Sequence, residues 1–310
     1  MSRADAAQAA GREVTVTVPA TSANLGPGFD ALGLALSLRD EVRVRVEPAS
    51  APEVTVHVEG EGADSVPRDA SHRVVRALHA TYDRLGLPRP HLTMSCTNRI
   101  PHGRGLGSSA AAAVAGVLAA RALSGAALDT EVALALATDL EGHPDNAAAC
   151  LLGGLTIAWT DRSGTHAVRM ETAPGVRAVV FVPSTELSTD TARGLLPATV
   201  PHADAAHAAG RAALLVEALT RRPELLLPAT EDRLHQGYRA PAMPATAGLV
   251  DALRAAGVAA VVSGAGPSVL ALTAAVDEPA VPPPPGWTVL DLPVSSRGAQ
   301  VGPSGGHDSP

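Results

Sequence analysis

The chain has 310 residues, of which 46% are hydrophobic and 18% charged, a balance typical of a globular protein with two domains of about 150 residues each. Its net charge of −7 argues against a nucleic-acid partner, because a phosphate backbone is bound by a basic surface. No hydrophobic stretch reaches the roughly 20 residues that cross a membrane, so we expect no membrane contact. Two cysteines form neither a zinc site on their own nor a disulfide framework, which indicates a reducing, cytoplasmic setting.

The predicted elements mix strands and helices without the regular spacing of a doubly wound sheet, which favours an α+β fold. Hydrophobic periodicity and turn residues set their limits. The first half predicts strands over 14–18, 42–46, 54–58 and 91–97, and another that follows Gly153-Gly154 within 151–160. It predicts helices over 71–85, 108–123 (with Ser108 as its N-cap) and 130–140. After a loop over 161–175, the second half predicts strands over 176–182, 258–262, 269–273 and 289–292, and helices over 203–220 and 245–256.

These elements predict an N-terminal domain over residues 13–165 and a C-terminal domain over 175–292. The polar, alanine-rich residues 1–12 are predicted to be disordered. The stretch 293–310 is rich in glycine, serine and proline, which predicts a disordered tail.

The sharpest local signal is the glycine loop Pro101-His102-Gly103-Arg104-Gly105-Leu106-Gly107-Ser108-Ser109-Ala110-Ala111. Alternate glycines let the backbone turn tightly and expose consecutive N–H groups, and the following helix adds the positive end of its dipole. Together they predict a cradle for a polyphosphate. All 24 basic residues are arginine, so the lysine-dependent phosphate loop GxxxxGK[ST] is excluded. A glycine-rich turn before an ordinary buried helix is the alternative interpretation.

This loop resembles that of the GHMP small-molecule kinases, which reads Pro-x-x-x-Gly-Leu-Gly-Ser-Ser-Ala. The stretch Val18–Asp30, VPATSANLGPGFD, is similar to the N-terminal signature of the branch that phosphorylates homoserine, and Ser263–Ser268, SGAGPS, is similar to the third family motif. The resemblance implies a two-domain GHMP kinase fold, with a ribosomal-S5-like N-terminal domain and a ferredoxin-like C-terminal domain. It places ATP in the cleft between them, bound by the glycine loop, Gly264 and Gly266.

The resemblance also implies the substrate L-homoserine, whose side-chain hydroxyl is phosphorylated in threonine biosynthesis. Its ammonium group needs a carboxylate and a neutral acceptor, and Asp30 and Asn24 can supply them across a Gly-Pro-Gly turn. A turn residue at Asn24 and a helix cap at Asp30 are the structural alternatives.

An arginine fork suits the substrate carboxylate. Within Ser188–Arg193 the family places a threonine and an arginine on the substrate, which assigns these roles to Thr189 and Arg193. Arg239 resembles the second arginine of the family, although Gly237 replaces the usual proline. A lone arginine is more often a solvent-exposed charge.

The sequence Glu141-Gly-His-Pro-Asp-Asn146 is the remaining constellation. By resemblance Glu141 holds Mg²⁺ together with the hydroxyl of Ser108 or Ser109, and Asp145 is a competing ligand. Asn146 occupies the position of a catalytic aspartate in sister kinases. Because an amide cannot accept a proton at pH 7, catalysis is expected to rest on positioning and on charge stabilisation by Arg193. His143 is expected to orient this loop or to contact the substrate.

Several alternatives stay open. A GHMP kinase for another small alcohol, and a non-catalytic nucleotide-binding homologue, would both keep the fold. A serine hydrolase using Ser108 or Ser109 is disfavoured because the chain has no GxSxG elbow. Relatives of this kind often form homodimers, so a homodimer is expected. Phe29 is expected to fill the core rather than to support the substrate loop.

Overall fold

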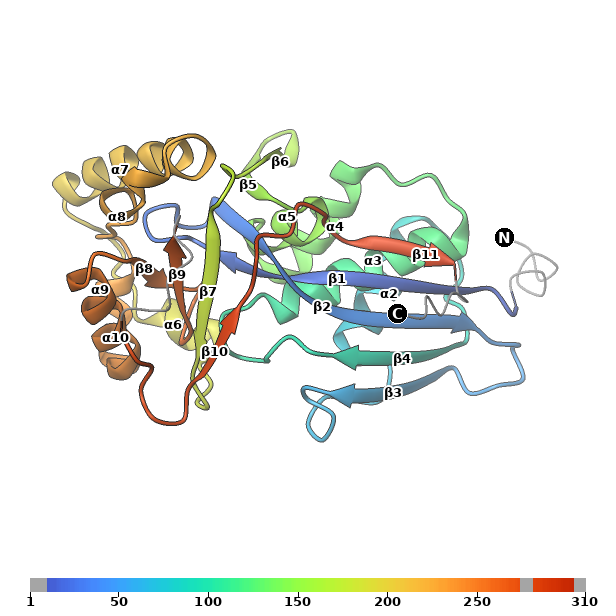
Figure 1. Ribbon diagram of the computed structural model, residues 1–310. Coiled ribbons are helices and arrows are strands. Elements are labelled where there is room, and N and C mark those ends of the chain that lie inside the picture. Colours follow the sequence, from blue (N-terminus) through green and yellow to red (C-terminus); the bar gives the residue numbers. More distant parts are fainter. Residues whose placement is uncertain (1–9, 274–280, 304–310) are drawn as a thin grey trace.

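A seven-stranded sheet organises the N-terminal domain of the computed structural model, which describes residues 10–273 and 281–303. Its strand order is β11-β1-β2-β4-β3, and β5 continues from the start of β2 and pairs with β6 (Figure 1). The strands are β1 (Glu13–Ala23), β2 (Leu32–Val46), β3 (Val54–Gly60), β4 (Leu92–Asn98), β5 (Leu155–Asp161), β6 (Gly164–Met170) and β11 (Gln300–Pro303).

Four helices cover one face of this sheet: α2 (Arg73–Arg84), α3 (Ser108–Ser124), α4 (Thr130–Glu141) and α5 (Asp145–Leu152) (Figure 1). The alanine-rich α3 lies against β1 and is buried along most of its length. Its Gly116 permits a close approach to α2, since a Cβ there would lie 2.3 Å from the carbonyl oxygen of Val74. The N-cap of α3 is Gly107 in the left-handed region, not Ser108 as the sequence predicts.

The C-terminal domain contains a four-stranded antiparallel sheet of order β10-β7-β9-β8, with the longest helix, α7, beside it (Figure 1). Phe181, Leu253 and Val269 contribute to its core. The strands are β7 (Arg177–Val182), β8 (Ala259–Val262), β9 (Val269–Thr273) and β10 (Thr288–Asp291). The helices are α6 (Thr189–Gly194), α7 (His202–Thr220), α8 (Leu226–Ala229), α9 (Gln236–Arg239) and α10 (Pro244–Ala255), with the 3₁₀ turns Pro223–Leu225 and Ala240–Ala242.

The ends of the chain differ from the sequence-based prediction. Residues 293–303 are not a disordered tail, because β11 pairs with β1 and Val294 forms a bridge with Leu36. Arg12 is also held in place, since its side chain donates to the carbonyl oxygen of Leu123. The predicted loop over 161–175 contains β6, so the larger sheet continues past the predicted boundary at residue 165. Residues 1–9 and 304–310 of the predicted disordered ends lie outside the described residues.

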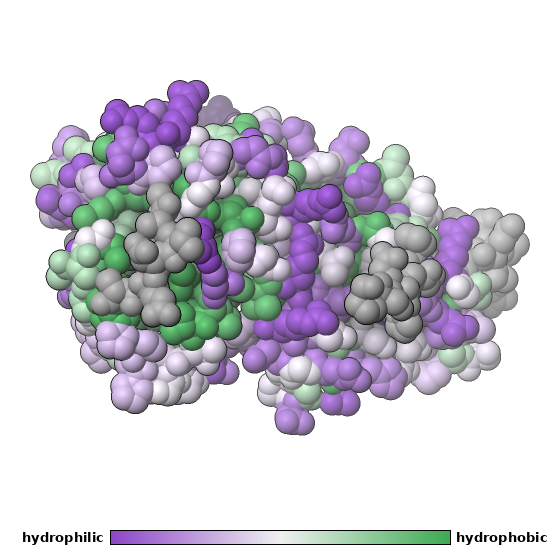
Figure 2. Space-filling model, viewed as in Figure 1, coloured by the Kyte–Doolittle hydropathy of each residue, from purple (hydrophilic) through white to green (hydrophobic). Residues whose placement is uncertain are grey.

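Hydrophilic and hydrophobic residues are distributed differently over the surfaces of the two domains. In the view of Figure 2, hydrophilic residues extend along the N-terminal domain, where alternate residues of β2 such as Arg43 and Arg45 are exposed, while hydrophobic residues gather over part of the C-terminal domain. In the described part of the chain, no helix combines the length and the apolar character needed to cross a membrane.

Candidate active site

The glycine loop meets both other family-like stretches between the two domains. A Cβ at Gly105 would lie 2.2 Å from the carbonyl oxygen of Ser263, and a Cβ at Gly107 would lie 1.9 Å from Oγ1 of Thr21. The hydroxyl of Ser263 donates to the carbonyl of Gly105 at 2.7 Å. Glycine is therefore required at these positions by close packing as well as by the positive φ angles of 71° and 69°.

The residues of the glycine loop do not all face the cleft. Gly103, Gly105, Leu106, Gly107, Ser108 and Ser109 line it. Ala110 and Ala111 are fully buried, and the N–H of Ala111 already donates to Gly107, so Ala111 offers a nucleotide neither a side chain nor a backbone donor. The N–H groups of the preceding helical residues have no acceptor within the helix.

Arg104 and His102 have other positions. The guanidinium of Arg104 donates to the carbonyl oxygens of His102, Pro183 and Ser184 and pairs with Glu186, so it joins the loop to the C-terminal domain. His102 lines a neighbouring cavity of about 400 Å³, which shares Ser108 and Ser109 with the cleft. Pro101, the first residue of the loop, lines neither space.

Asp30 and Arg193 lie opposite each other in the same cleft. Both oxygens of Asp30 accept from the guanidinium of Arg193, at 2.6 and 3.1 Å, and this pairing raises the pKa of Arg193. Asp30 is not a helix cap, because β2 follows it. Asn24 holds it in place: its Oδ1 accepts from the N–H of Asp30, and its Nδ2 donates to the carbonyl of Gly264. Both residues have positive φ, 66° and 55°, which fits the enrichment of Asn and Asp in this region.

Phe29 contacts two arginines of the site and does not fill the core as expected. Its ring centroid is 5.7 Å from the guanidinium carbon of Arg193 and 5.5 Å from that of Arg239, and its ring packs against His235. These distances fall within the range of cation–π attraction. The ring therefore holds both guanidinium groups at one end of the cleft.

Arg239 is 1% exposed, so it is not the solvent-exposed charge that its type alone suggests. It donates to the carbonyl of Ala192 at 3.1 Å and to Nδ1 of His235 at 3.1 Å. Since a guanidinium can only donate, Nδ1 of His235 accepts, and Nε2 donates to the carbonyl of Gly26. Burial lowers the pKa of His235, which agrees with this neutral tautomer.

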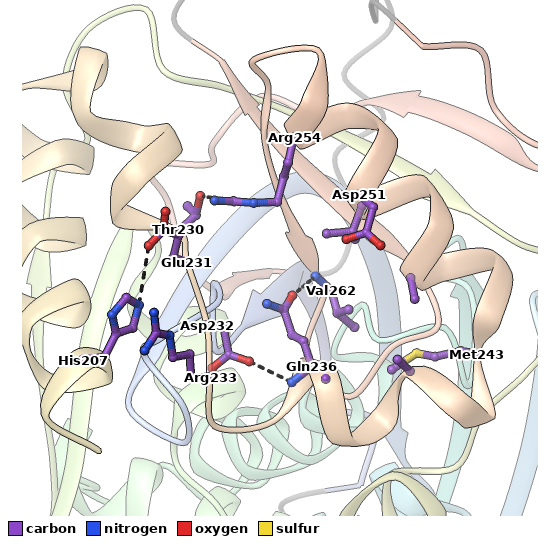
Figure 3. Close-up of a pocket in the computed structure, with 14 residues that line it drawn as sticks. His207, Thr230, Glu231, Asp232, Arg233, Gln236, Met243, Asp251, Arg254 and Val262 are labelled. Atoms are coloured by element: carbon purple, nitrogen blue, oxygen red, sulfur yellow. Dashed lines mark hydrogen bonds and ion pairs between the residues drawn. The ribbon is translucent and has the colours of Figure 1, made fainter. Parts of the chain in front are cut away.

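The one-turn helix α9, which carries Arg239, is fixed from its other side (Figure 3). The buried carboxylate of Asp232 accepts from the N–H groups of Leu234, His235 and Gln236, and Oε1 of Gln236 accepts from the N–H of Val262 at 2.5 Å. Both side chains line a cavity of about 470 Å³ behind α9. Arg239 is therefore held in place by contacts outside the cleft.

The carboxylates of the constellation 141–146 have separate partners. The hydroxyl of Ser109 contacts both oxygens of Glu141 at 2.7 Å, and Arg73 also pairs with Glu141. In the described part of the chain, it is Ser109 and not Ser108 that makes this contact. Asp145 accepts from the N–H of Asn146 and pairs with His143 at 3.1 Å, which raises the pKa of His143 against the effect of burial.

Asn146 is oriented by a residue that the sequence analysis did not select. The hydroxyl of Thr21, itself fully buried, donates to Oδ1 of Asn146 at 2.8 Å, so the amide is turned with its NH₂ group away from Thr21. Thr21 belongs to the stretch VPATSANLGPGFD, which could have drawn attention to it. Arg73 lies in none of the family-like stretches, and an exposed arginine at the start of an amphipathic helix does not by itself indicate a functional residue.

Fourteen further residues line this cleft together with the glycine loop residues named above. They come from the stretch Val18–Asp30, the sequence 141–146 and the C-terminal domain, so the cleft brings together most of the predicted site. The predicted members among them are Asn24, Asp30, Glu141, His143, Asn146, Thr189, Arg193, Arg239, Gly264 and Gly266.

Comparison with known proteins agrees with this geometry. The family model described as GHMP kinases N terminal domain matches residues 72–154, and the model GHMP kinases C terminal matches residues 205–280. A homoserine kinase of Streptomyces avermitilis is 57% identical over 295 residues, which cover 94% of this chain and 96% of that protein. The chain belongs to the GHMP kinase family.

Further relatives of this GHMP kinase share its length and fold. A homoserine kinase of Clavibacter michiganensis is 52% identical, over 95% of this chain and 96% of that protein. The crystal structure of a homoserine kinase from Cytophaga hutchinsonii has a TM-score of 0.81 at 27% identity, covering 93% of this chain and 97% of that one. The prediction of a two-domain α+β GHMP kinase fold is therefore confirmed.

Proposed function

We propose that this GHMP kinase transfers the γ-phosphoryl group of ATP to the side-chain hydroxyl of L-homoserine, giving O-phospho-L-homoserine for threonine biosynthesis. Three curated relatives that are 57%, 56% and 52% identical to it are homoserine kinases. The observation that carries the proposal is that one cleft contains both the glycine loop and the set Asp30, Arg193 and Arg239. A carboxylate and two arginines complement the ammonium and carboxylate groups of an amino acid.

In this proposal, Asp30 binds the substrate ammonium and Asn24 positions Asp30. Arg193 and Arg239 receive the carboxylate, and the ring of Phe29 contacts both guanidinium groups. Thr189, the first residue of α6, and His143 line the same cleft and complete the contacts to the substrate.

The triphosphate of ATP is proposed to bind at the N-terminus of α3, where backbone N–H groups and the helix dipole favour anions. The adenosine part then lies in the neighbouring cavity of about 400 Å³, since this cavity and the cleft meet at Ser108 and Ser109. Gly264 and Gly266 face the loop from the C-terminal domain.

The residues at Glu141 fit a magnesium ion. Glu141 is a buried carboxylate with only 6% of its side chain exposed, and the hydroxyl of Ser109 lies beside it, so both groups are hard oxygen donors. Asp145 is a weaker candidate because His143 and the N–H of Asn146 already engage it. When bound, Mg²⁺ supplies positive charge to the phosphate oxygens, and one protein carboxylate suffices because ATP and water provide the other ligands.

The chemistry is proposed to proceed without a strong protein base. The homoserine oxygen forms the new bond to the γ-phosphorus as the bond to the ADP oxygen breaks, and the hydroxyl proton passes to a phosphate oxygen or to water. Asn146, held by Thr21, can donate from its NH₂ group to the reacting oxygens but cannot take the proton. Arg193 stabilises the charge that develops on the phosphoryl group.

The experiment is a substrate panel. The purified protein is given ATP and Mg²⁺ with homoserine, mevalonate, galactose or shikimate, and ADP release and phosphorylated product are measured. We expect turnover with homoserine. Turnover with another alcohol and none with homoserine would contradict the substrate, and ATP binding without any turnover would indicate a non-catalytic homologue. The expected cytoplasmic location and homodimer stay predictions.

A further inference from the structure

Arg73 lies at the junction of the two cavities that the proposed function assigns to the nucleotide and the substrate. It is the first residue of α2, and its guanidinium contacts the carboxylate of Glu141 and the hydroxyl of Ser109. Arg73 lines the proposed adenosine cavity, whereas Glu141 lines the cleft and Ser109 lines both. A triphosphate that connects the two cavities must therefore pass beside Arg73.

Other arginines near the glycine loop are already engaged. Arg104 donates to three carbonyl oxygens, and Arg193 pairs with both oxygens of Asp30. Arg239 is buried and donates to the carbonyl of Ala192 and to His235. The chain contains no lysine, and of the two arginines that line the proposed adenosine cavity, Arg73 and Arg76, it is Arg73 that contacts Ser109 and Glu141. The side chain of Arg73 is 44% exposed, which leaves it room to change rotamer.

A metal ion bound at Glu141 would replace Arg73 as the cation beside this carboxylate. A carboxylate that is 6% exposed needs a cation beside it, and Arg73 supplies one. Mg²⁺ at Glu141 would compete with the guanidinium for the same oxygens, while two oxygens of a phosphate group can accept hydrogen bonds from the same planar guanidinium.

Building on the proposed function, we propose that Arg73 is a phosphate-binding residue with two alternative partners, Glu141 and the β- and γ-phosphate oxygens of ATP, and that Mg²⁺ at Glu141 shifts it to the phosphates. Arg73→Ala should therefore change two binding affinities in opposite directions. Binding of Mg²⁺–ATP weakens because a phosphate contact is lost, whereas binding of a divalent ion without nucleotide becomes tighter because Glu141 loses its competing partner.

Both consequences can be measured as binding, without turnover. Titration calorimetry with Mg²⁺–ATP and with adenosine is compared between the unmodified protein, Arg73→Ala and Arg73→Lys, and Mn²⁺ binding without nucleotide is followed by electron paramagnetic resonance. Arg84→Ala is the matched control, because Arg84 is exposed in the last turn of the same helix. If Arg73→Ala fails to fold, Arg73→Gln removes the charge while keeping a long side chain.

We expect Arg73→Ala to weaken Mg²⁺–ATP binding at least about tenfold, to change adenosine binding less than about twofold and to tighten Mn²⁺ binding severalfold, with substantial recovery of ATP affinity in Arg73→Lys. Unchanged Mg²⁺–ATP affinity, or equal losses for ATP, adenosine and Mn²⁺, would overturn the proposal, the latter by showing a structural role. A protein that binds Mg²⁺–ATP but does not phosphorylate homoserine would refute the proposed function and leave this test intact.

Discussion

The carboxylate of Asp30 accepts two hydrogen bonds from the guanidinium of Arg193, although 163 residues separate them in the chain. These are the groups proposed to bind opposite ends of an amino acid. Homoserine must therefore insert its own charges into an existing ion pair, and a site that pairs acid with base in this way favours a zwitterion over a ligand of one charge. The side chains are 34% and 36% exposed, so the pair is accessible from the cleft.

Asp30→Asn should weaken homoserine binding while leaving ATP binding nearly unchanged. The amide keeps the shape of the side chain but removes the charge that faces the ammonium, so the KM for homoserine should rise at least about tenfold. Steady-state kinetics with each substrate varied in turn measures the effect. Asp190→Asn, an exposed carboxylate on α6, is the control. Equal losses for both substrates with a lower Tm would show a structural role for Asp30.

Arg193→Ala should lower kcat on the order of 100-fold, because a cation that stabilises the transferring phosphoryl group is removed. Rapid-quench measurement of one turnover separates this chemical step from substrate binding. Arg193→Lys retains the charge but not the forked guanidinium, so its kcat should lie between those of the unmodified enzyme and Arg193→Ala. A kcat close to that of the unmodified enzyme would exclude Arg193 from catalysis and leave it a binding role.

Phe29→Leu should raise the KM for homoserine on the order of tenfold with a smaller change in kcat. Leucine fills much of the same volume but offers no aromatic face, and two cation–π contacts of about 0.5–1 kcal/mol each are lost. Phe29→Tyr keeps the ring and should behave almost like the unmodified enzyme. If leucine and tyrosine give the same KM, the ring acts only by filling space.

Gly107→Ala should impair ATP binding and lower Tm, because its Cβ would collide with Thr21 and displace the hydroxyl that orients Asn146. Gly125→Ala is a close match: both glycines flank α3 with φ near 68°, but Gly125 has open space around it. The left-handed conformation costs alanine about 1–2 kcal/mol at either site. Only Gly107→Ala should lower ATP affinity, by about tenfold or more, as calorimetry can show.

The His143–Asp145 pair should stabilise the fold most strongly at low pH. The hydrogen bond to Asp145 raises the pKa of His143 in the folded protein above its ordinary value of 6.5. The contribution is therefore fully present below pH 6.5 and is lost as the pH rises through the folded-state pKa. The Tm difference between the unmodified protein and His143→Gln should shrink from pH 5.5 towards about pH 9. A Tm difference that grows with pH would contradict a raised pKa for His143. His57→Gln, at an exposed histidine, is the control.

Sequence reasoning succeeded where local patterns decide the structure. The glycine loop and α3 were predicted because the turn and the helix depend on residues adjacent in the chain. The buried state of Arg239 could not be predicted, because it depends on Phe29 and Ala192, which come from distant segments. The contact between Arg73 and Glu141 likewise joins residues 68 positions apart.

The strand β11 was missed for a different reason. Its sequence, QVGP, has little hydrophobic alternation, and its pairing is specified by the edge of β1 that receives it. The helix α5 was missed because it is only eight residues long and begins directly after a proline.

The pairing of β11 with β1 makes the C-terminal domain an insertion between two parts of the larger sheet. During translation, the ribosome must therefore synthesise the whole C-terminal domain before the last strand of the first sheet exists. The nascent N-terminal half therefore emerges with one edge of β1 unpaired, and the larger sheet is completed only when β11 pairs with that edge.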